Sequence, residues 1–434
     1  MIELLLVILA GIIIGIFTGL LPALPVFTAP FLLYYFHSDL QLESLLIFWL
    51  AVVSGSQFFG SVAVITTKIA GEESSTIYLR DLDDIPLERK NTLLYDTALG
   101  SYIAGLFAVS IMWFATTYMN ADLLPVLMSV NAQIIIYTLA IASFFFVNKS
   151  KVWTLALIVL GIVIAPRNNY ALPDVWYQVQ EVFQGYSFYM IILGLILLPE
   201  VLTKQGLPLL SDESYKAVKQ KFKWMLAIKS SLIGAVSGLI PGPSASLGST
   251  YAYRLFGKHK EEKIVAAETA NNGAVITSAL PLLLLALPIN TNTMIMSNLM
   301  DIKSIDINLS ILESSSVFPE LSIVQLVMVV LLGVLTVYYF LSTHLIDWYI
   351  GIVKGLHHTI KPLLAIIVLA LIGVDLYASE ITFERYMLLL GFFYSIGLVL
   401  KRYNVNPIVL LFSIILSDKL IWLYIQAFNI HIIN

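Results

Sequence analysis

Long apolar runs separated by short polar segments dominate the pattern of this chain. A helix rises ~1.5 Å per residue, so about 20 apolar residues cross the ~30 Å hydrocarbon core of a bilayer. The runs that fit one spanning helix are 45–66, 93–117, 131–147, 152–166, 186–202, 321–341, 362–377, 383–400 and 404–426. The pattern therefore predicts an all-α polytopic membrane protein.

Three further apolar stretches are interrupted by proline. Proline inside a helix removes a hydrogen bond and clashes with the preceding turn, so these stretches predict broken or re-entrant helices. The stretches are 1–36 (with Pro22, Pro25 and Pro30), 226–256 (with Pro241 and Pro243) and 264–300 (with Pro281 and Pro288).

The basic residues assign sides to these elements. Because Lys and Arg favour cytoplasmic loops, the basic loops should lie inside, and they alternate correctly if 1–36 and 226–256 are hairpins that return to their starting side. The predicted topology has about ten full spans and two helical hairpins, and it places the N-terminus and the C-terminus outside. The basic loops are 67–92, 148–151, 203–225, 254–263 and 401–402.

This assignment predicts two inverted-topology repeats, 1–203 and 226–434, joined by a basic cytoplasmic linker at 204–225. The first repeat breaks at 22–25, and the second breaks at 241–243, 281 and 288. Residues 15–23 match residues 234–242 at an offset of 219, with Gly, Gly, Leu and Pro aligned. Inverted repeats with broken helices are typical of secondary transporters. The alternative for the G-x-x-x-G glycines is helix packing.

Composition excludes several classes of protein, partner and site. The 434 residues are 59% hydrophobic and 12% charged, about half the charge of soluble domains, which excludes a soluble globular protein. A net charge of −4 favours no nucleic acid partner. The chain has 0 Cys, which excludes disulfides and thiolate metal sites, and its 6 His show no metal-binding spacing. We expect no cofactor and no metal centre.

Polar residues inside apolar stretches are costly unless they face a cavity or one another. Broken helices expose N–H groups that favour anions and carbonyls that suit Na⁺, so the breaks predict a site for an anion and a coupling cation near the midplane. The substrate-binding candidates are Pro22, Ala23, Pro25, Ser61, Pro241, Gly242, Pro243, Ser244, Asn271, Asn272 and Asn292. The coupling-ion candidates are Gly60, Gly71, Glu268 and Asn290. An interhelical clamp remains the alternative for Asn271 and Asn272.

Several motifs match one family. The second half carries Phe256-Gly257-Lys258, Ala267-Glu268-Thr269-Ala270-Asn271-Asn272-Gly273, Leu280-Pro281-Leu282-Leu283 and Leu287-Pro288, and the first half carries Pro22-Ala23, Phe59-Gly60-Ser61 and Ala70-Gly71-Glu72. These residues resemble the large membrane subunit of tripartite tricarboxylate transporters over about 15–105 and 234–300. Ala23, Phe59, Ala70 and Ile289 stand where the family has Gly or Pro.

The resemblance implies a transporter of the cytoplasmic (inner) membrane that takes up a small tricarboxylate or dicarboxylate by symport. The coupling ion would be Na⁺ or H⁺, and Na⁺ is favoured because no predicted span carries a His. The implied partners are a small membrane subunit and a periplasmic binding protein, beside membrane lipid. A stand-alone member and a homo-oligomer remain alternatives.

Two other classes stay open from the residues. Broken helices also build the filters of channels. An intramembrane hydrolase could use Ser244 or Ser246 as nucleophile with Lys229 as base, although no residue in the pattern orients that lysine.

Overall fold

The chain is described here from a computed structural model. The described residues are 2–20, 40–67, 73–118, 129–147, 150–165, 183, 185–203, 222–240, 244–285, 288–290, 292–293, 296–297, 300, 311–344, 348, 360–379, 381–403, 405 and 407–427.

Two compact units divide the chain, and each unit combines a part of the first half with a part of the second. Unit 1 comprises Met1–Asn120 and Gly206–Ile360, and unit 2 comprises Ala121–Gln205 and Lys361–Asn434. These units are interleaved in sequence, and therefore differ from the predicted repeats 1–203 and 226–434, which are consecutive.

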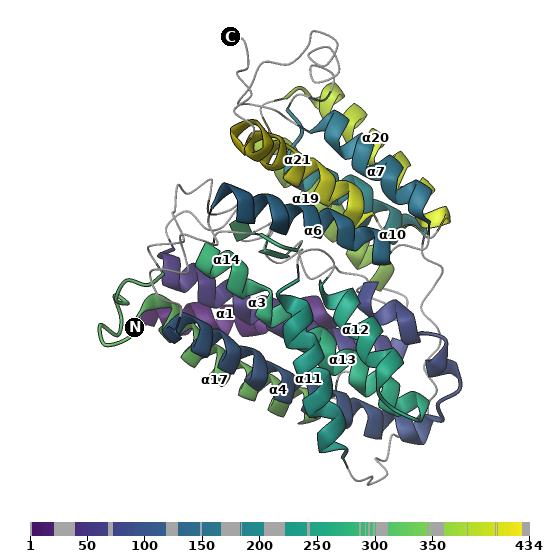
Figure 1. The fold of residues 1–434 in the computed structure, drawn as a ribbon. Coiled ribbons are helices and arrows are strands. Elements are labelled where there is room, and N and C mark those ends of the chain that lie inside the picture. Colours follow the sequence, from purple (N-terminus) through teal and green to yellow (C-terminus); the bar gives the residue numbers. More distant parts are fainter. Residues whose placement is uncertain are drawn as a thin grey trace. The chain divides into compact units, whose positions relative to one another are not determined.

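The α-helices of unit 1 are labelled in Figure 1, and two 3₁₀ helices accompany them. They are α1 (Ile2–Leu20), α3 (Leu42–Thr67), the 3₁₀ helices η1 (Glu73–Tyr78) and η2 (Asp81–Asp83), α4 (Leu87–Tyr118), α11 (Trp224–Gly238), α12 (Ser244–Leu255), α13 (Lys260–Thr277), α14 (Ala279–Leu285) and α17 (Ile323–His344).

The helices of unit 2 form a second group. They are α6 (Val130–Val147), α7 (Lys151–Ile164), α9 (Phe188–Ile192), the π-helix η3 (Leu193–Leu197), α10 (Leu198–Thr203), α19 (Ile360–Ala378), α20 (Phe383–Arg402) and α21 (Ile408–Ala427).

Every predicted apolar run coincides with one of these helices, or with the consecutive segments α9, η3 and α10 at 186–202. Within the described residues, five helices are long and apolar enough to cross a bilayer: Ile2–Leu20, Leu42–Thr66, Thr92–Tyr118, Ile323–His344 and Phe383–Arg402. The helical, polytopic class is therefore supported, whereas the ten full spans stay a prediction.

Two of the three proline-containing stretches are divided into separate helices, whereas the prolines of 1–36 lie outside the described residues. Residues 226–256 hold α11 and α12, whose helical residues stop at Gly238 and resume at Ser244. In 264–300 the interruption lies at Ser278, one turn before the predicted break at Pro281. Pro281 still explains the interruption, because a proline has no N–H to donate to the carbonyl oxygen four residues earlier, here that of Thr277, and its ring clashes with that carbonyl.

Two helices form the middle of unit 1. Gln57 and Ser61 of α3 contact Asn271 and Glu268 of α13, so the two helices run antiparallel. α1 packs on α3, and both α11 and α12 pack on α13. Residues 264–277 of α13 are buried throughout, which explains how a helix rich in polar residues is placed inside the unit.

Glycines allow two of these helix pairs to approach closely. A Cβ on Gly15 would lie 3.1 Å from the carbonyl oxygen of Ala51, and a Cβ on Gly234 would lie 2.3 Å from that of Ala270. The packing interpretation of the G-x-x-x-G glycines is thus the one that the structure supports. Proximity of backbones, rather than ligand contact, explains these glycines.

We expect Gly234→Ala to destabilise the protein. The new methyl group would overlap the Ala270 carbonyl, and overpacking costs about 1–3 kcal/mol, more than the ~0.5–1 kcal/mol that alanine gains in a helix. Gly333→Ala in α17 is the matched control, since no described atom lies within 4 Å of its Cβ position. Thermal unfolding in detergent measures both, and equal midpoints would contradict the packing described here.

Unit 2 contains a close helix pair and a buried carboxylate. Gly397 of α20 lies against η3, where an added Cβ would be 2.4 Å from the carbonyl oxygen of Leu195. Asp375 of α19 accepts hydrogen bonds from Ser187 (2.9 Å) and Tyr386 (2.7 Å). Because Ser187 also caps α9, this carboxylate ties the ends of three helices together.

Candidate coupling-ion site

One carboxylate is fully enclosed in unit 1. Glu268 of α13 is 1% exposed, and its carboxylate accepts hydrogen bonds from the hydroxyl groups of Ser61, Tyr78 and, at 3.2 Å, Ser75. Among the residues that the structure describes, Glu268 forms no ion pair. A buried carboxylate is therefore held by neutral donors alone.

Two elements from the first half of the chain bring these hydroxyls to α13. Ser61 lies one helical turn after Gln57 on α3, and its hydroxyl also reaches the Gln57 carbonyl oxygen at 3.2 Å. Ser75 and Tyr78 lie three residues apart on η1. A 3₁₀ helix has three residues per turn, which places both side chains on the face towards Glu268.

The segment after η1 is fastened to the second half. Tyr253 of α12 donates to Asp81, and Lys260 at the start of α13 pairs with Asp81 at 3.5 Å and with Asp84. The Lys260 pairs are exposed to solvent and therefore weak individually. Together with the buried Leu82, they hold η1 against α13 and so keep Ser75 and Tyr78 at the carboxylate.

Two asparagines extend the site along α13. Asn271 donates from Nδ2 to Gln57 Oε1 at 2.9 Å, and Asn272 donates to the Glu268 carbonyl oxygen at 3.0 Å. The Oδ1 atoms of both, and the hydroxyl of the neighbouring Thr269, are buried without a hydrogen-bond partner in the described part of the chain. Buried polar atoms normally have partners, so these oxygens can accept a further ligand.

The chemistry of this set suits a small cation. A carboxylate, hydroxyl groups and orphaned amide oxygens are hard oxygen donors of the kind that bind alkali cations inside transporters. An ionised Glu268 would need such a cation, because an unpaired charge is costly away from water. A cluster of several His, Cys, Asp or Glu side chains that would hold a transition metal is not found within the described ranges.

The structure brings together four of the predicted residues here: Glu268, which the sequence assigned to the coupling ion, and Ser61, Asn271 and Asn272, which it assigned to the substrate. Gly60 lies beside Ser61, and no described atom is within 4 Å of its Cβ position. The clamp proposed as the alternative for the asparagines is present in part, because Asn271 does join α13 to α3. It leaves the two amide oxygens without a role.

A separate cluster contains two other candidates. Asn290 donates from Nδ2 to the hydroxyl of Ser244 at 3.4 Å, and its Oδ1 accepts from the Thr293 backbone N–H at 3.0 Å. Ser244 starts α12, so this contact ties the α11–α12 pair to the turn at 288–293. Asn290 acts here as a turn cap, and the half-buried Asn292 lies beside Thr293 in the same turn.

The remaining candidates cannot be placed in this arrangement. Pro22, Ala23, Pro25, Gly71, Pro241, Gly242 and Pro243 lie outside the described residues.

Two site residues, Gln57 and Tyr78, were missed by the sequence interpretation. Gln57 could have been found, since it is a polar residue inside the apolar run 45–66, four positions before Ser61. Ser75 lies in the polar segment 70–75, which the sequence left open between the lining of a site and a solvated loop. No pattern in the sequence marks Tyr78, because only the packing of η1 against α13 brings its hydroxyl to the Glu268 carboxylate.

Comparison with known proteins gives a family match. The model of the tripartite tricarboxylate transporter TctA family matches residues 5–412. The chain is also 26% identical over 308 residues to a protein of Agrobacterium vitis named "Uncharacterized 52.8 kDa protein in TAR-I ttuC' 3'region". That alignment covers 64% of this chain and 60% of the relative, less than two thirds of its length. No solved structure matches the chain.

Proposed function

Because the chain belongs to the tripartite tricarboxylate transporter TctA family, we propose that it is a secondary active transporter that takes up a small tricarboxylate or dicarboxylate by symport. The observation that carries this proposal is Glu268, a buried carboxylate without an ion-pair partner in the described residues, beside orphaned amide oxygens. A transporter needs such a site for the ion that drives uptake.

The proposed coupling ion is Na⁺. Two amide oxygens and several hydroxyls are ligands for a cation but contribute nothing to binding a proton on Glu268. A proton would need only the carboxylate, whose three hydroxyl donors could then reorient. The oxygen-rich surroundings therefore favour Na⁺ over H⁺, and a pH-driven uptake would reverse the assignment.

The proposed substrate site is formed by residues 22–25 and 241–243, with Ser244 and Asn292 from neighbouring segments. A carboxylate that enters the membrane loses water, and its charge must be paired. The N-terminus of α12, which begins at Ser244, offers backbone N–H groups for this purpose. The contact between Ser244 and Asn290 supports the placement, since it keeps the turn at 288–293 next to that helix start.

We also propose that the halves are inverted repeats. The offset of 219 that relates Gly15 to Gly234 also relates their contact partners, Ala51 and Ala270. α1 therefore packs on α3 in the register in which α11 packs on α13. Since α3 and α13 run antiparallel, the two helix pairs have opposite directions in unit 1, as inverted repeats require.

Single cysteines test the orientation that this proposal requires. The chain contains 0 Cys, so each variant has one label site without background. We expect Gln41→Cys and Glu384→Cys to react with an impermeant maleimide from outside, and Lys258→Cys and Arg402→Cys to react only after permeabilisation, since basic loops stay inside. Labelling of Gln41→Cys and Lys258→Cys from the same side would refute the inverted repeat.

The alternatives are less well supported. For an intramembrane hydrolase, Ser244 is buried whereas the proposed base Lys229 is exposed. The Ser244 hydroxyl accepts a hydrogen bond from the Asn290 amide, whereas a nucleophile would donate its proton to a base. Membership of a transporter family also argues against hydrolysis. A channel would conduct without accumulation, which uptake measurements distinguish.

The proposed membrane and partner proteins are those that the family implies. The chain would work in the cytoplasmic membrane with a small membrane subunit and a periplasmic binding protein that delivers the carboxylate.

Uptake into proteoliposomes tests the function. Purified protein is reconstituted and offered radiolabelled mono-, di- and tricarboxylates, with and without the binding protein, under an inward Na⁺ gradient. We expect saturable uptake of a di- or tricarboxylate to above the external concentration, and collapse of this uptake when the gradient is removed. Non-saturable flux that only equilibrates the two sides would favour a channel.

A further inference from the structure

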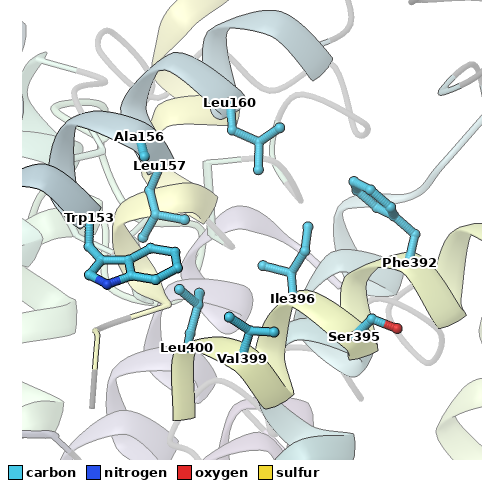
Figure 2. Close-up of a pocket in the computed structure, with 9 residues that line it drawn as sticks. All are labelled: Trp153, Ala156, Leu157, Leu160, Phe392, Ser395, Ile396, Val399 and Leu400. Atoms are coloured by element: carbon cyan, nitrogen blue, oxygen red, sulfur yellow. The ribbon is translucent and has the colours of Figure 1, made fainter. Parts of the chain in front are cut away.

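An apolar pocket lies between two helices of unit 2. Its volume is about 310 Å³, and α7 and α20 each contribute one face with residues spaced three and four apart (Figure 2). Its principal lining residues are Trp153, Leu157, Leu160, Phe392, Ile396 and Val399. Pockets for small ligands start at ~300 Å³, so the space fits part of a slender molecule.

The lining is suited to hydrocarbon. Ser395 supplies a hydroxyl, and this hydroxyl already donates to the Gly391 carbonyl oxygen at 2.8 Å. Figure 2 shows aliphatic side chains of both helices between Trp153 at one end and Phe392 at the other. A polar ligand would lose its hydrogen bonds to water in this pocket and find few groups to replace them, whereas an acyl chain has no such hydrogen bonds to lose.

One end of the pocket carries positive charge. The rings of Trp153 and Tyr403 lie 5.4 Å apart, which places the start of α7 beside the end of α20. Lys151 begins α7, and Lys401 and Arg402 end α20. All three are exposed. Lys401 donates to the Pro199 carbonyl oxygen at 3.1 Å, and Arg402 forms no ion pair with a described residue.

Aromatic and basic residues at helix ends mark the level of the lipid headgroups. Basic sites between helices on the cytoplasmic side attract anionic headgroups.

We propose that this pocket binds one acyl chain of an anionic phospholipid, whose phosphate group lies at Lys151, Lys401 and Arg402. The charge at one end and the hydrocarbon lining along the rest match the two parts of such a lipid. A protein partner would need ~1,000 Å² or more of interface, and the pocket alone does not require one. This site lies within unit 2 and is independent of the proposed coupling-ion site.

Two variants separate the parts of the proposed site. Ala156→Trp would fill the pocket, since Ala156 lines it and is exposed; Leu155→Trp, exposed on the same helix but outside the lining, is its control. Arg402→Gln would weaken the headgroup contact, with Arg385→Gln near the other end of α20 as its control.

Native mass spectrometry of the delipidated full chain measures the binding of phosphatidylglycerol and phosphatidylcholine with identical acyl chains. We expect a preference for phosphatidylglycerol that falls about fivefold in Arg402→Gln, since each basic residue near a headgroup contributes ~1 kcal/mol. Ala156→Trp should lose bound phosphatidylglycerol while both controls retain it.

Equal binding of the two lipids by the wild type would overturn the proposal, as would full binding by Ala156→Trp. A change in oligomeric state with Ala156→Trp, with lipid binding unaltered, would also overturn it in favour of a second protein chain as the occupant.

Discussion

Glu268→Gln is expected to abolish Na⁺-driven uptake of the carboxylate in proteoliposomes while the protein stays folded. Glutamine has almost the same shape and can keep hydrogen bonds to Ser61, Ser75 and Tyr78, but it removes the negative charge that a cation needs. Loss of one member of a buried charge pair costs about 3–5 kcal/mol. The Na⁺ affinity should therefore fall by more than ~100-fold.

Glu261→Gln is the matched control for this change. Glu261 lies on the same helix, but it is partly exposed and pairs with Arg89 at 3.0 Å outside the site. An exposed pair contributes at most ~1 kcal/mol, so uptake by Glu261→Gln should equal that of the wild type. Full Na⁺-driven accumulation by Glu268→Gln would remove Glu268 from the coupling site.

Asn271→Ala should lower the Na⁺ affinity by about 10- to 100-fold and leave some transport at high Na⁺. The change deletes the orphaned Oδ1 and the bond from Nδ2 to Gln57. A hydrogen bond or ligand contact to a charged group contributes about 1.5–3 kcal/mol, less than the charge of Glu268. The Na⁺ concentration that gives half-maximal uptake measures the effect.

The stability of Asn271→Ala must be separated from its Na⁺ affinity. If the asparagine were only a clamp between α3 and α13, the variant would unfold at a lower temperature but keep the wild-type Na⁺ dependence. Asn131→Ala, exposed at the start of α6, should change neither quantity. Unaltered Na⁺ dependence in Asn271→Ala would thus confine the residue to packing.

Most of the helices could be predicted because bilayer thickness fixes the length of an apolar run. The same rule predicted the position of α3. The composition of α13 was also unusual, because Glu268, Asn271 and Asn272 lie inside an apolar stretch. The family resemblance, drawn from these residues, is confirmed by the match over residues 5–412. The hydropathy pattern and the residue types of short motifs were therefore sufficient to predict the helices and the family.

The assembly of the site could not be predicted, because it depends on contacts between distant segments. Tyr78 and Glu268 are 190 residues apart, and nothing near Tyr78 in the sequence indicates where η1 docks. The interleaved units likewise follow from tertiary packing, in which each unit combines segments of both halves. The break at Ser278 was misplaced by one turn, since proline disturbs the turn before itself.

Direct binding of ²²Na⁺ to purified protein tests the central claim, that the Glu268 cluster is a cation site. Scintillation proximity measures this binding without transport, substrate or partner subunits. The account predicts saturable binding to the wild type and to Glu261→Gln, and no saturable binding to Glu268→Gln. Equal ²²Na⁺ binding by wild type and Glu268→Gln, or none by either, would contradict it.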